Sequence, residues 1–403
     1  MNRFPFQATR TPLPLSITRV RSLWPNKSHE ALLRAALAPP QELAEAVTQW
    51  RAISSLDRFD YPSLTILPLL YHNLCRHECN PALRDHIKGV YRWSWHRNQL
   101  LVAALRGALA VLREVDVEAV VMKGVPLALR VYPTLGTRVM GDADVIVRRS
   151  RVAEAVKALV SAGWTAEREV DEATIASLGG INLRDDRGRC IDLHWHVLPD
   201  NYDDRRDDQL LECTVPIKIG EEPAACLSPA DHLLEILNHG LSWAANTPIH
   251  WITDSWLLLA AECDGIDWDR FVEQARLNRC VHSVRAALRY LAKTFDAPVP
   301  PDVLERLDRL RPGVTERAAF WFVERSDGSW AWGRALLVAA LFVRSSRARG
   351  RWPGPFGFMR FVSTRADCTP SQWLRRAAVD SFQHIGRIVS RMAGRSKRVQ
   401  EEV

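Results

Sequence analysis

The chain has 403 residues, of which 47% are hydrophobic and 25% are charged, so it can form two or three domains with ordinary globular cores. Its eight cysteines are scattered without a CxxC pair, which excludes a dense disulfide framework and favours reduced thiols in the cytoplasm. Residues 1–27 lack the apolar segment of a secretory signal, and the apolar run 335–343 is about half of the roughly 20 residues that span a bilayer. We therefore expect a cytoplasmic protein with a loose leader and no transmembrane segment.

Charge is distributed unevenly along the chain. From Arg311 onward there are 17 Lys and Arg against 7 Asp and Glu, whereas the whole chain has a net charge of +7. The basic character therefore belongs to the C-terminal region, which could attract an acidic partner, a nucleic acid or an anionic membrane surface. The alternative is a solvated, arginine-rich helical face.

The first part of the chain predicts helices. Apolar residues recur at spacings of three and four over 28–52, with a break at Pro39-Pro40, and the same pattern continues over 64–77 and 81–115. Within this part, His72, Cys75, His77 and Cys79 could suggest zinc. On a helix, however, residue 77 points away from the other three and no second ligand pair follows, so we interpret this cluster as part of a helix.

From Ala119 the pattern changes to short β-branched runs separated by helices, which indicates an α/β unit. A polar turn at Asp185–Gly188 predicts a β-hairpin, and beyond Pro199 we expect helices again, one of them capped by Ser228. The predicted strands are 119–122, 143–147, 165–170, 181–184 and 190–197; the predicted helices are 125–132, 150–162 (capped by Ser150) and, at the C-terminus, an amphipathic helix over 371–392 that could bind a membrane surface.

Two carboxylates in this unit suggest a metal site. Asp142 and Asp144 are two residues apart on a predicted strand, so they point to the same face. Two neighbouring acids repel each other unless a cation lies between them, and Mg²⁺ commonly binds carboxylates together with substrate phosphates.

The second arm of the hairpin adds a third acid. Asp192, His194 and His196 alternate along that arm and share one face, and the arm could lie beside the strand of Asp144. Three carboxylates can bridge two metal ions about 3.5–4 Å apart, as phosphoryl-transfer chemistry requires. The pair His194 and His196 offers a different, His-x-His metal site, but no further histidine-rich segment completes it.

Basic and small residues flank the acids. Lys123 and Arg138 supply positive charge for phosphates or for neutralising the acids, and Gly124 allows backbone N–H groups to approach a phosphate ahead of a helix. His232, His239 and Asp254 lie on later predicted helices, where we interpret them as packing or hydrogen-bonding residues.

This order of motifs resembles the nucleotidyltransferase superfamily with the DNA polymerase β-like fold, and within it a branch of uncharacterised bacterial nucleotidyltransferases. The residues that carry the resemblance are Lys123-Gly124, Tyr132-Pro133, Arg138, Gly141-Asp142-Ala143-Asp144 and Asp192-Leu193-His194-Trp195, with weaker support from Asn238-His239 and 251–254. The resemblance implies an α+β fold in which a small mixed β-sheet is embedded between N-terminal and C-terminal helical regions.

It also implies an activity, Mg²⁺-dependent transfer of a nucleoside monophosphate from an NTP to an acceptor that is a small molecule, a peptide or protein, or RNA. Asp142, Asp144 and Asp192 are then the catalytic residues and the ligands of two Mg²⁺ ions, and Lys123, Gly124 and Arg138 bind nucleotide. The alternative is an inactive member of the fold that serves as a scaffold and binds an acidic partner or nucleic acid through its basic C-terminal helices. The predicted regions are 1–27 (leader), 28–115 (helical), 116–200 (nucleotidyltransferase core), 201–310 (helical) and 311–403 (basic, helical).

Overall fold

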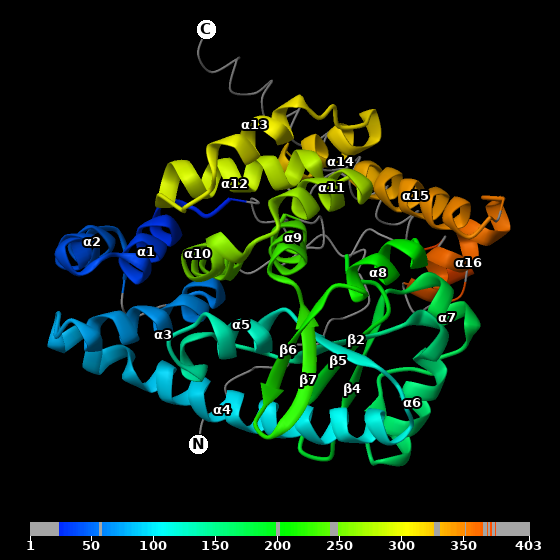
Figure 1. Ribbon diagram of the computed structural model, residues 1–403, viewed down its shortest axis with the longest axis horizontal. Coiled ribbons are helices and arrows are strands. Elements are labelled where there is room, and N and C mark those ends of the chain that lie inside the picture. The colour runs from blue at the N-terminus through cyan, green and yellow to red at the C-terminus, as the bar shows by residue number, and fades with distance from the viewer. Residues whose placement is uncertain are drawn as a thin grey trace, which may run out of the picture.

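The structure is a computed structural model that describes residues 24–55, 59–198, 202–241, 249–325, 331–350 and 352–365, with 369, 371, 372 and 375. Nearly all of the predicted leader and of the predicted helix over 371–392 lie outside these residues. Within them no helix is both long enough and apolar enough to cross a bilayer. The fold is α+β, with one mixed sheet between helical regions, as predicted (Figure 1).

The sheet has seven strands in the order β3-β4-β5-β2-β1-β7-β6 within the described residues. Its centre is mixed, because β2 pairs parallel with β5 and antiparallel with β1, while β1 pairs parallel with β7. The strands are β1 (Ala119–Met122), β2 (Ala143–Val147), β3 (Thr165–Ala166), β4 (Gly180–Arg184), β5 (Cys190–His194), β6 (Thr214–Ile219) and β7 (Glu222–Leu227).

Strand alternation gives the sheet two apolar faces. Val121, Val145 and Leu193 point to the face covered by the long helix α4 and by α6, whereas Val120 and Ile146 point to the opposite face, toward α9 and its neighbours. In Figure 1, α4 runs below the strands and α9 and α10 lie above them. The second face is the one that matters for function, because polar residues interrupt its apolar surface.

The helices before the sheet follow the sequence pattern. The two N-terminal helices are separated by Ala38-Pro39, and Asp60 and Asn80 cap α3 and α4 by accepting hydrogen bonds from Ser63 N and Leu83 N. These helices are α1 (Lys27–Leu37), α2 (Pro40–Ile53), α3 (Tyr61–Arg76) and α4 (Pro81–Glu114). Their assignment as helices is confirmed.

Shorter helices connect the strands, and a larger helical region follows them. Inside the sheet region these are α5 (Gly124–Arg130), η1 (Leu135–Thr137), η2 (Arg149–Arg151), α6 (Val152–Ser161), α7 (Glu172–Ser177) and α8 (Asp204–Leu211). After it come α9 (Pro229–Gly240), α10 (His250–Glu262), η3 (Cys263–Gly265), α11 (Trp268–Leu277), α12 (Val281–Phe295), α13 (Pro301–Arg309), α14 (Val314–Arg325), α15 (Ala331–Ala348) and α16 (Pro355–Arg365). The predicted cap of α9 is confirmed, since the Ser228 side chain accepts a hydrogen bond from Asp231 N.

The described part of the basic C-terminal region packs against the edge of the sheet domain. Arg365 Nη1 donates to the carbonyl oxygen of Ser177 at 3.0 Å, and Arg168 Nη1 donates to that of Thr364, also at 3.0 Å. Helices α16 and α7 therefore lie side by side, at the right of Figure 1. Some of the basic charge is thus used within the molecule.

Three local predictions were wrong. The region beyond Pro199 does not consist of helices alone, because β6 and β7 follow α8 and form a hairpin that completes the sheet. The strand expected over 165–170 has only two residues, and α6 begins after Arg151 with no side-chain cap rather than at Ser150. β6 is an edge strand and its apolar residues do alternate, but Pro216 and Pro223 count against strands, because proline donates no hydrogen bond to a ladder.

Candidate active site

Two acids meet on neighbouring central strands, on the face of the sheet below α9. Asp144 of β2 and Asp192 of β5 are direct partners in the parallel register, and both are at least nine-tenths buried. His194 follows Asp192 by two residues, so alternation places it on the same face. Ligand atoms of Asp144, Asp192 and His194 all lie within 4.8 Å of one another.

His194 lies at the centre of this cluster. Its Nε2 atom is 3.0 Å from Asp144 Oδ1, 3.1 Å from Asp192 Oδ2 and 3.2 Å from Lys123 Nζ. A single ring nitrogen cannot donate to two carboxylates and also accept from an ammonium group, so these groups compete for it. Without its proton, Nε2 is a metal ligand in the same position.

Lys123 supplies the cation that now contacts the acids. Its Nζ atom lies 2.6 Å from Asp144 Oδ1, and its side chain is 13% exposed. The backbone of Lys123 has φ 57° and ψ −119°, a region that residues other than glycine seldom adopt and that costs on the order of 1–3 kcal/mol. We infer that this turn is retained because it directs the ammonium group toward the acids.

The electrostatics of the cluster agree with its geometry. Burial would raise the pKa of Asp144, but the charge of Lys123 and the hydrogen bond from His194 hold that pKa well below its usual range. Burial lowers the pKa of His194, but the interactions with Asp192 and Asp144 raise it by more. The pKa of His194 therefore lies above its usual value. Asp144 therefore stays ionised at neutral pH and attracts a cation.

Asp142 is separated from the other two acids. It lies one residue ahead of β2, is only half-buried, and does not belong to the set of close ligand atoms. Because the strand begins at Ala143, the ladder does not fix the direction of the Asp142 side chain. Its carboxylate lies near Cys190, whose pKa is raised to about 12 by burial and then by the charge of Asp142. Its role as a metal ligand stays a prediction.

Arg138 is bound to a residue from a distant helix. Its Nε and Nη2 atoms donate to Asp254 Oδ1 and Oδ2, each at 2.8 Å, and both side chains are buried. Tyr132 donates to the same Asp254 Oδ1 at 2.6 Å. The interpretation of Asp254 as a hydrogen-bonding residue is confirmed. The expected contact of Arg138 with nucleotide stays a prediction, and Asp254 occupies the Nε and Nη2 edge of its guanidinium group.

Gly124 is required by this ion pair. A Cβ atom at Gly124 would lie 2.3 Å from Arg138 Nη1 and 3.1 Å from Met140 Sδ. The absence of a side chain therefore makes room for the guanidinium group. The sequence-based reason for this glycine, approach of a phosphate to its backbone, stays a prediction.

Helix α9 covers the cluster and contributes two residues that the sequence did not assign to it. His232 Nε2 donates to the carbonyl oxygen of Lys123 at 3.2 Å, and burial followed by the charge of Arg130 lowers the pKa of His232 to about 4. Glu235, one turn later, is 1% exposed, and neither of its carboxylate oxygens has a hydrogen-bond partner among the described residues. The only sequence signal for Glu235 is an acid inside the apolar run of 233–237.

The donor set fits a divalent cation. Two ionised carboxylates are the ligands that Mg²⁺ prefers, and an imidazole nitrogen beside them also suits Mn²⁺. The buried Glu235 carboxyl group has no hydrogen-bond partner among the described residues, and a bound cation nearby would stabilise it. Asp144, Asp192 and His194 would hold the cation. In the structure, the ammonium group of Lys123 contacts Asp144 instead.

A second group of close ligand atoms consists of His196, Asp204 and Asp207. Both oxygens of Asp207 are already used: Oδ2 lies 2.6 Å from His196 Nδ1, and Oδ1 accepts from Val197 N at 2.9 Å. This group joins α8 to the end of β5. Since His194 and His196 contact different acids, the structure does not support a His-x-His site.

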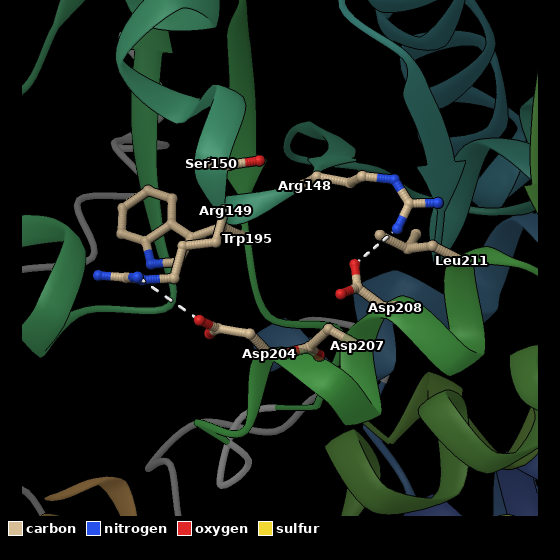
Figure 2. Close-up of a pocket in the computed structure, with 8 residues that line it drawn as sticks. All are labelled: Arg148, Arg149, Ser150, Trp195, Asp204, Asp207, Asp208 and Leu211. Atoms are coloured by element: carbon tan, nitrogen blue, oxygen red, sulfur yellow. Dashed lines mark hydrogen bonds and ion pairs between the residues drawn. The ribbon is translucent and has the colours of Figure 1, made fainter. Parts of the chain in front are cut away.

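Next to this second group is a cavity of about 210 Å³, between the turn at 148–150 and α8 (Figure 2). Arg148 Nη1 is 2.6 Å from Asp208 Oδ1, and Arg149 Nη1 is 3.5 Å from Asp204 Oδ2. Ser150 and Trp195 complete the wall between these pairs. Because the charges compensate each other and the cavity excludes the central acids, we assign the chemistry to the cluster of Asp144.

The cysteine and histidine cluster of α3 does not form a metal site in the described part of the chain. His72, Cys75, His77 and Cys79 do not appear in any set of close ligand atoms. Their interpretation as part of a helix and its end agrees with the structure, since α3 ends at Arg76.

Comparison with known proteins identifies a family. The family model described as "Uncharacterised nucleotidyltransferase" matches residues 63–296, which is more than half of the chain. A solved structure of an antigenic nucleotidyltransferase-like protein from Paracoccidioides brasiliensis matches 53% of this chain and 95% of its own, at 14% sequence identity and a TM-score of 0.31, a value too low to carry an argument. The comparison with curated proteins gave no match.

Proposed function

The chain belongs to this family of uncharacterised nucleotidyltransferases, and from that premise we propose that it is an active, metal-dependent enzyme that transfers a nucleoside monophosphate from an NTP to a nucleophile. The observation that carries the proposal is the pairing of Asp144 with Asp192 on adjacent strands, with His194 between them. Buried acids that share one cation are more easily explained by a metal site than by stability, because isolated like charges in a core are destabilising.

Each residue of the cluster has a proposed task. Asp144, Asp192 and His194 hold the divalent cation, and Asp142 is kept as a further ligand, in line with two Mg²⁺ ions. When bound, the metal neutralises the triphosphate and lowers the pKa of the attacking hydroxyl. Lys123, freed from Asp144, would bind the triphosphate, with Gly124 and Arg138 on the same side of the site.

The reaction balances without another co-reactant. An oxygen of the acceptor forms a bond to the α-phosphorus of the NTP, the bond from that phosphorus to the bridging oxygen breaks, and pyrophosphate leaves. The proton of the acceptor passes to the Asp192 carboxylate, next to which His194 Nε2 lies at 3.1 Å. The acceptor is a small molecule, a peptide or protein, or RNA, and the seven described cysteines, all free thiols, agree with a cytoplasmic location.

The test uses α-labelled NTPs, Mg²⁺ and a cell extract as the source of acceptor, because the acceptor is unknown. Transfer of label should require the protein and should fall by about 1,000-fold in Asp192→Asn, the size of effect expected when a charge that acts in the transition state is removed. Asp208→Asn is the matched control, since it removes an exposed acid paired with Arg148 away from the cluster. Full transfer by Asp192→Asn would contradict the proposal.

A further inference from the structure

Glu235 differs from every other buried acid in the described part of the chain. Asp144, Asp254 and the remaining buried aspartates each have at least one hydrogen bond or ion pair, whereas both oxygens of Glu235 have none. Glu235 is only 1% exposed. A buried polar group without a partner costs about 1–3 kcal/mol, and more when it is charged, so its retention calls for a role.

The position of Glu235 on α9 directs it toward the acid cluster. His232, three residues earlier, contacts the carbonyl oxygen of Lys123, and residues three apart share one face of a helix. Burial raises the pKa of Glu235 to about 8, while the charges of Lys123 and His194 lower it and that of Asp144 raises it. The carboxyl group therefore lies within electrostatic range of the cluster.

Glu235 lies outside the group of direct ligand atoms. Its oxygens do not belong to the set of ligand atoms formed by Asp144, Asp192 and His194, which lie within 4.8 Å of one another. Mg²⁺ gives up its water reluctantly and usually keeps several water molecules in a protein site. A carboxylate that is outside the direct ligands but within electrostatic range of them can accept hydrogen bonds from such water.

We propose that Glu235 is a further acidic residue of the metal site, which accepts a hydrogen bond from water on the divalent cation once that cation has displaced the Lys123 ammonium group from Asp144. The inference rests on the proposed function only in taking the cluster to be a metal site. Two carboxylates and the Lys123 ammonium group sum to a single negative charge, whereas the same carboxylates and a divalent cation sum to zero. The exchange therefore removes the net negative charge that opposes ionisation of Glu235.

The experiment measures Mn²⁺ binding without nucleotide, by electron paramagnetic resonance of the free ion, for wild type and Glu235→Gln. We expect the variant to bind Mn²⁺ between 10-fold and 100-fold more weakly, the range found for residues that support metal ligands. In the absence of metal its melting temperature should equal or exceed that of wild type, because an unpartnered carboxyl has been removed. A purely structural residue would change stability without changing Mn²⁺ affinity.

A matched control is Glu262→Gln on the neighbouring helix α10, where the carboxylate is paired with Arg130 away from the cluster. Its Mn²⁺ affinity should equal that of wild type. If Glu235→Gln does not fold, Glu235→Met keeps the length of the side chain without a carboxyl group and is measured instead. An unchanged affinity in the folded variant, or a wild-type protein that binds no Mn²⁺, would overturn the inference.

The outcomes also separate this inference from the proposed activity. A protein whose Mn²⁺ affinity depends on Glu235 but which transfers no nucleotide supports the inference and contradicts the activity. A protein that transfers nucleotide, and whose Glu235→Gln variant binds Mn²⁺ as tightly as wild type, supports the activity and contradicts the inference about Glu235.

Discussion

Two groups of buried charges lie close to each other in this molecule and are built in different ways. In one, Arg138 and Asp254 form two parallel hydrogen bonds, and Tyr132 takes a further position on Asp254. In the other, Lys123, Asp144, Asp192 and His194 converge on one point, where a single imidazole nitrogen lies within 3.2 Å of three charged groups.

The difference shows how a structural ion pair can be told from a binding site. The Arg138 pair is closed, because both oxygens of Asp254 are engaged by one edge of the guanidinium group and Tyr132 adds a further hydrogen bond. The Asp144 cluster is open, because its contacts compete and the carboxyl of Glu235 lies nearby without a partner. A closed pair holds distant segments together, whereas an open cluster is completed by an additional cation.

The largest expected effect comes from removing a charge of the open cluster. Asp144→Asn should reduce nucleotide transfer by about 1,000-fold or more, equivalent to about 4 kcal/mol in the activation barrier. It should lower stability less than Asp254→Asn does, because it also relieves the repulsion between Asp144 and Asp192. Transfer assays and urea unfolding on the same samples measure both quantities. Near-normal transfer, or a stability loss above that of Asp254→Asn, would count against the distinction.

The next effect comes from opening the closed pair. Asp254→Asn should lower the free energy of unfolding by about 3–5 kcal/mol, because it leaves the buried Arg138 without a charged partner. The double variant Arg138→Met with Asp254→Leu should recover most of that loss, since apolar residues can replace a buried ion pair. Denaturant midpoints at equal slope provide the measurement. If the double variant is less stable than Asp254→Asn, the pair is more than a structural connection.

A smaller effect is expected from pH, through the helix that covers the open cluster. The pKa of His232 is lowered to about 4 in the folded protein, against about 6.5 unfolded. The unfolded state therefore binds more protons below pH 6.5, and stability falls as the pH decreases from about 6.5 to about 4, by up to about 3 kcal/mol. His232→Gln keeps a donor for the Lys123 carbonyl and should remove this part of the pH dependence. Parallel stability curves for wild type and variant would show that His232 does not contribute.

The smallest effect is the stabilisation of the open cluster by metal. Mg²⁺ at about ten times its dissociation constant should increase the free energy of unfolding by on the order of 1 kcal/mol, and a chelator should reverse this. Asp192→Asn should lose the response, and the Asp254→Asn variant should keep it as long as it is folded. Thermal unfolding with and without Mg²⁺ gives the answer. Equal stabilisation of wild type and Asp192→Asn would place metal binding elsewhere.

Most of the helices and the hairpin of β4 and β5 could be predicted, because they depend on local periodicity and on a clear turn at 185–188. The adjacency of the strands of Asp144 and Asp192 was only a possibility from the sequence, and the structure shows it. The β6–β7 hairpin was not predicted, although apolar residues alternate along β6, because Pro216 and Pro223 count against strands. Proline has no N–H group to donate to a ladder, and Pro216 is tolerated here because β6 is an edge strand.

Contacts across long stretches of sequence were the other limit. Arg138 and its partner Asp254 are 116 residues apart, and no pattern in either segment predicts the contact between them. Glu235 lies in a helix with apolar residues on both sides, where a charged residue is expected to face solvent. Only the packing of α9 on the Lys123 turn shows that this acid is buried beside the cluster.

The parallel register of β2 and β5 also decides whether a refolded molecule can bind the cation. Asp144 and Asp192 meet only when the two strands are aligned as they are here, and a slip of one residue would turn Leu193 toward the acids and Asp192 into the apolar layer against α4. Misaligned molecules would be unable to bind the cation. The fraction of refolded protein that binds Mn²⁺ would therefore report how many molecules have paired these strands correctly.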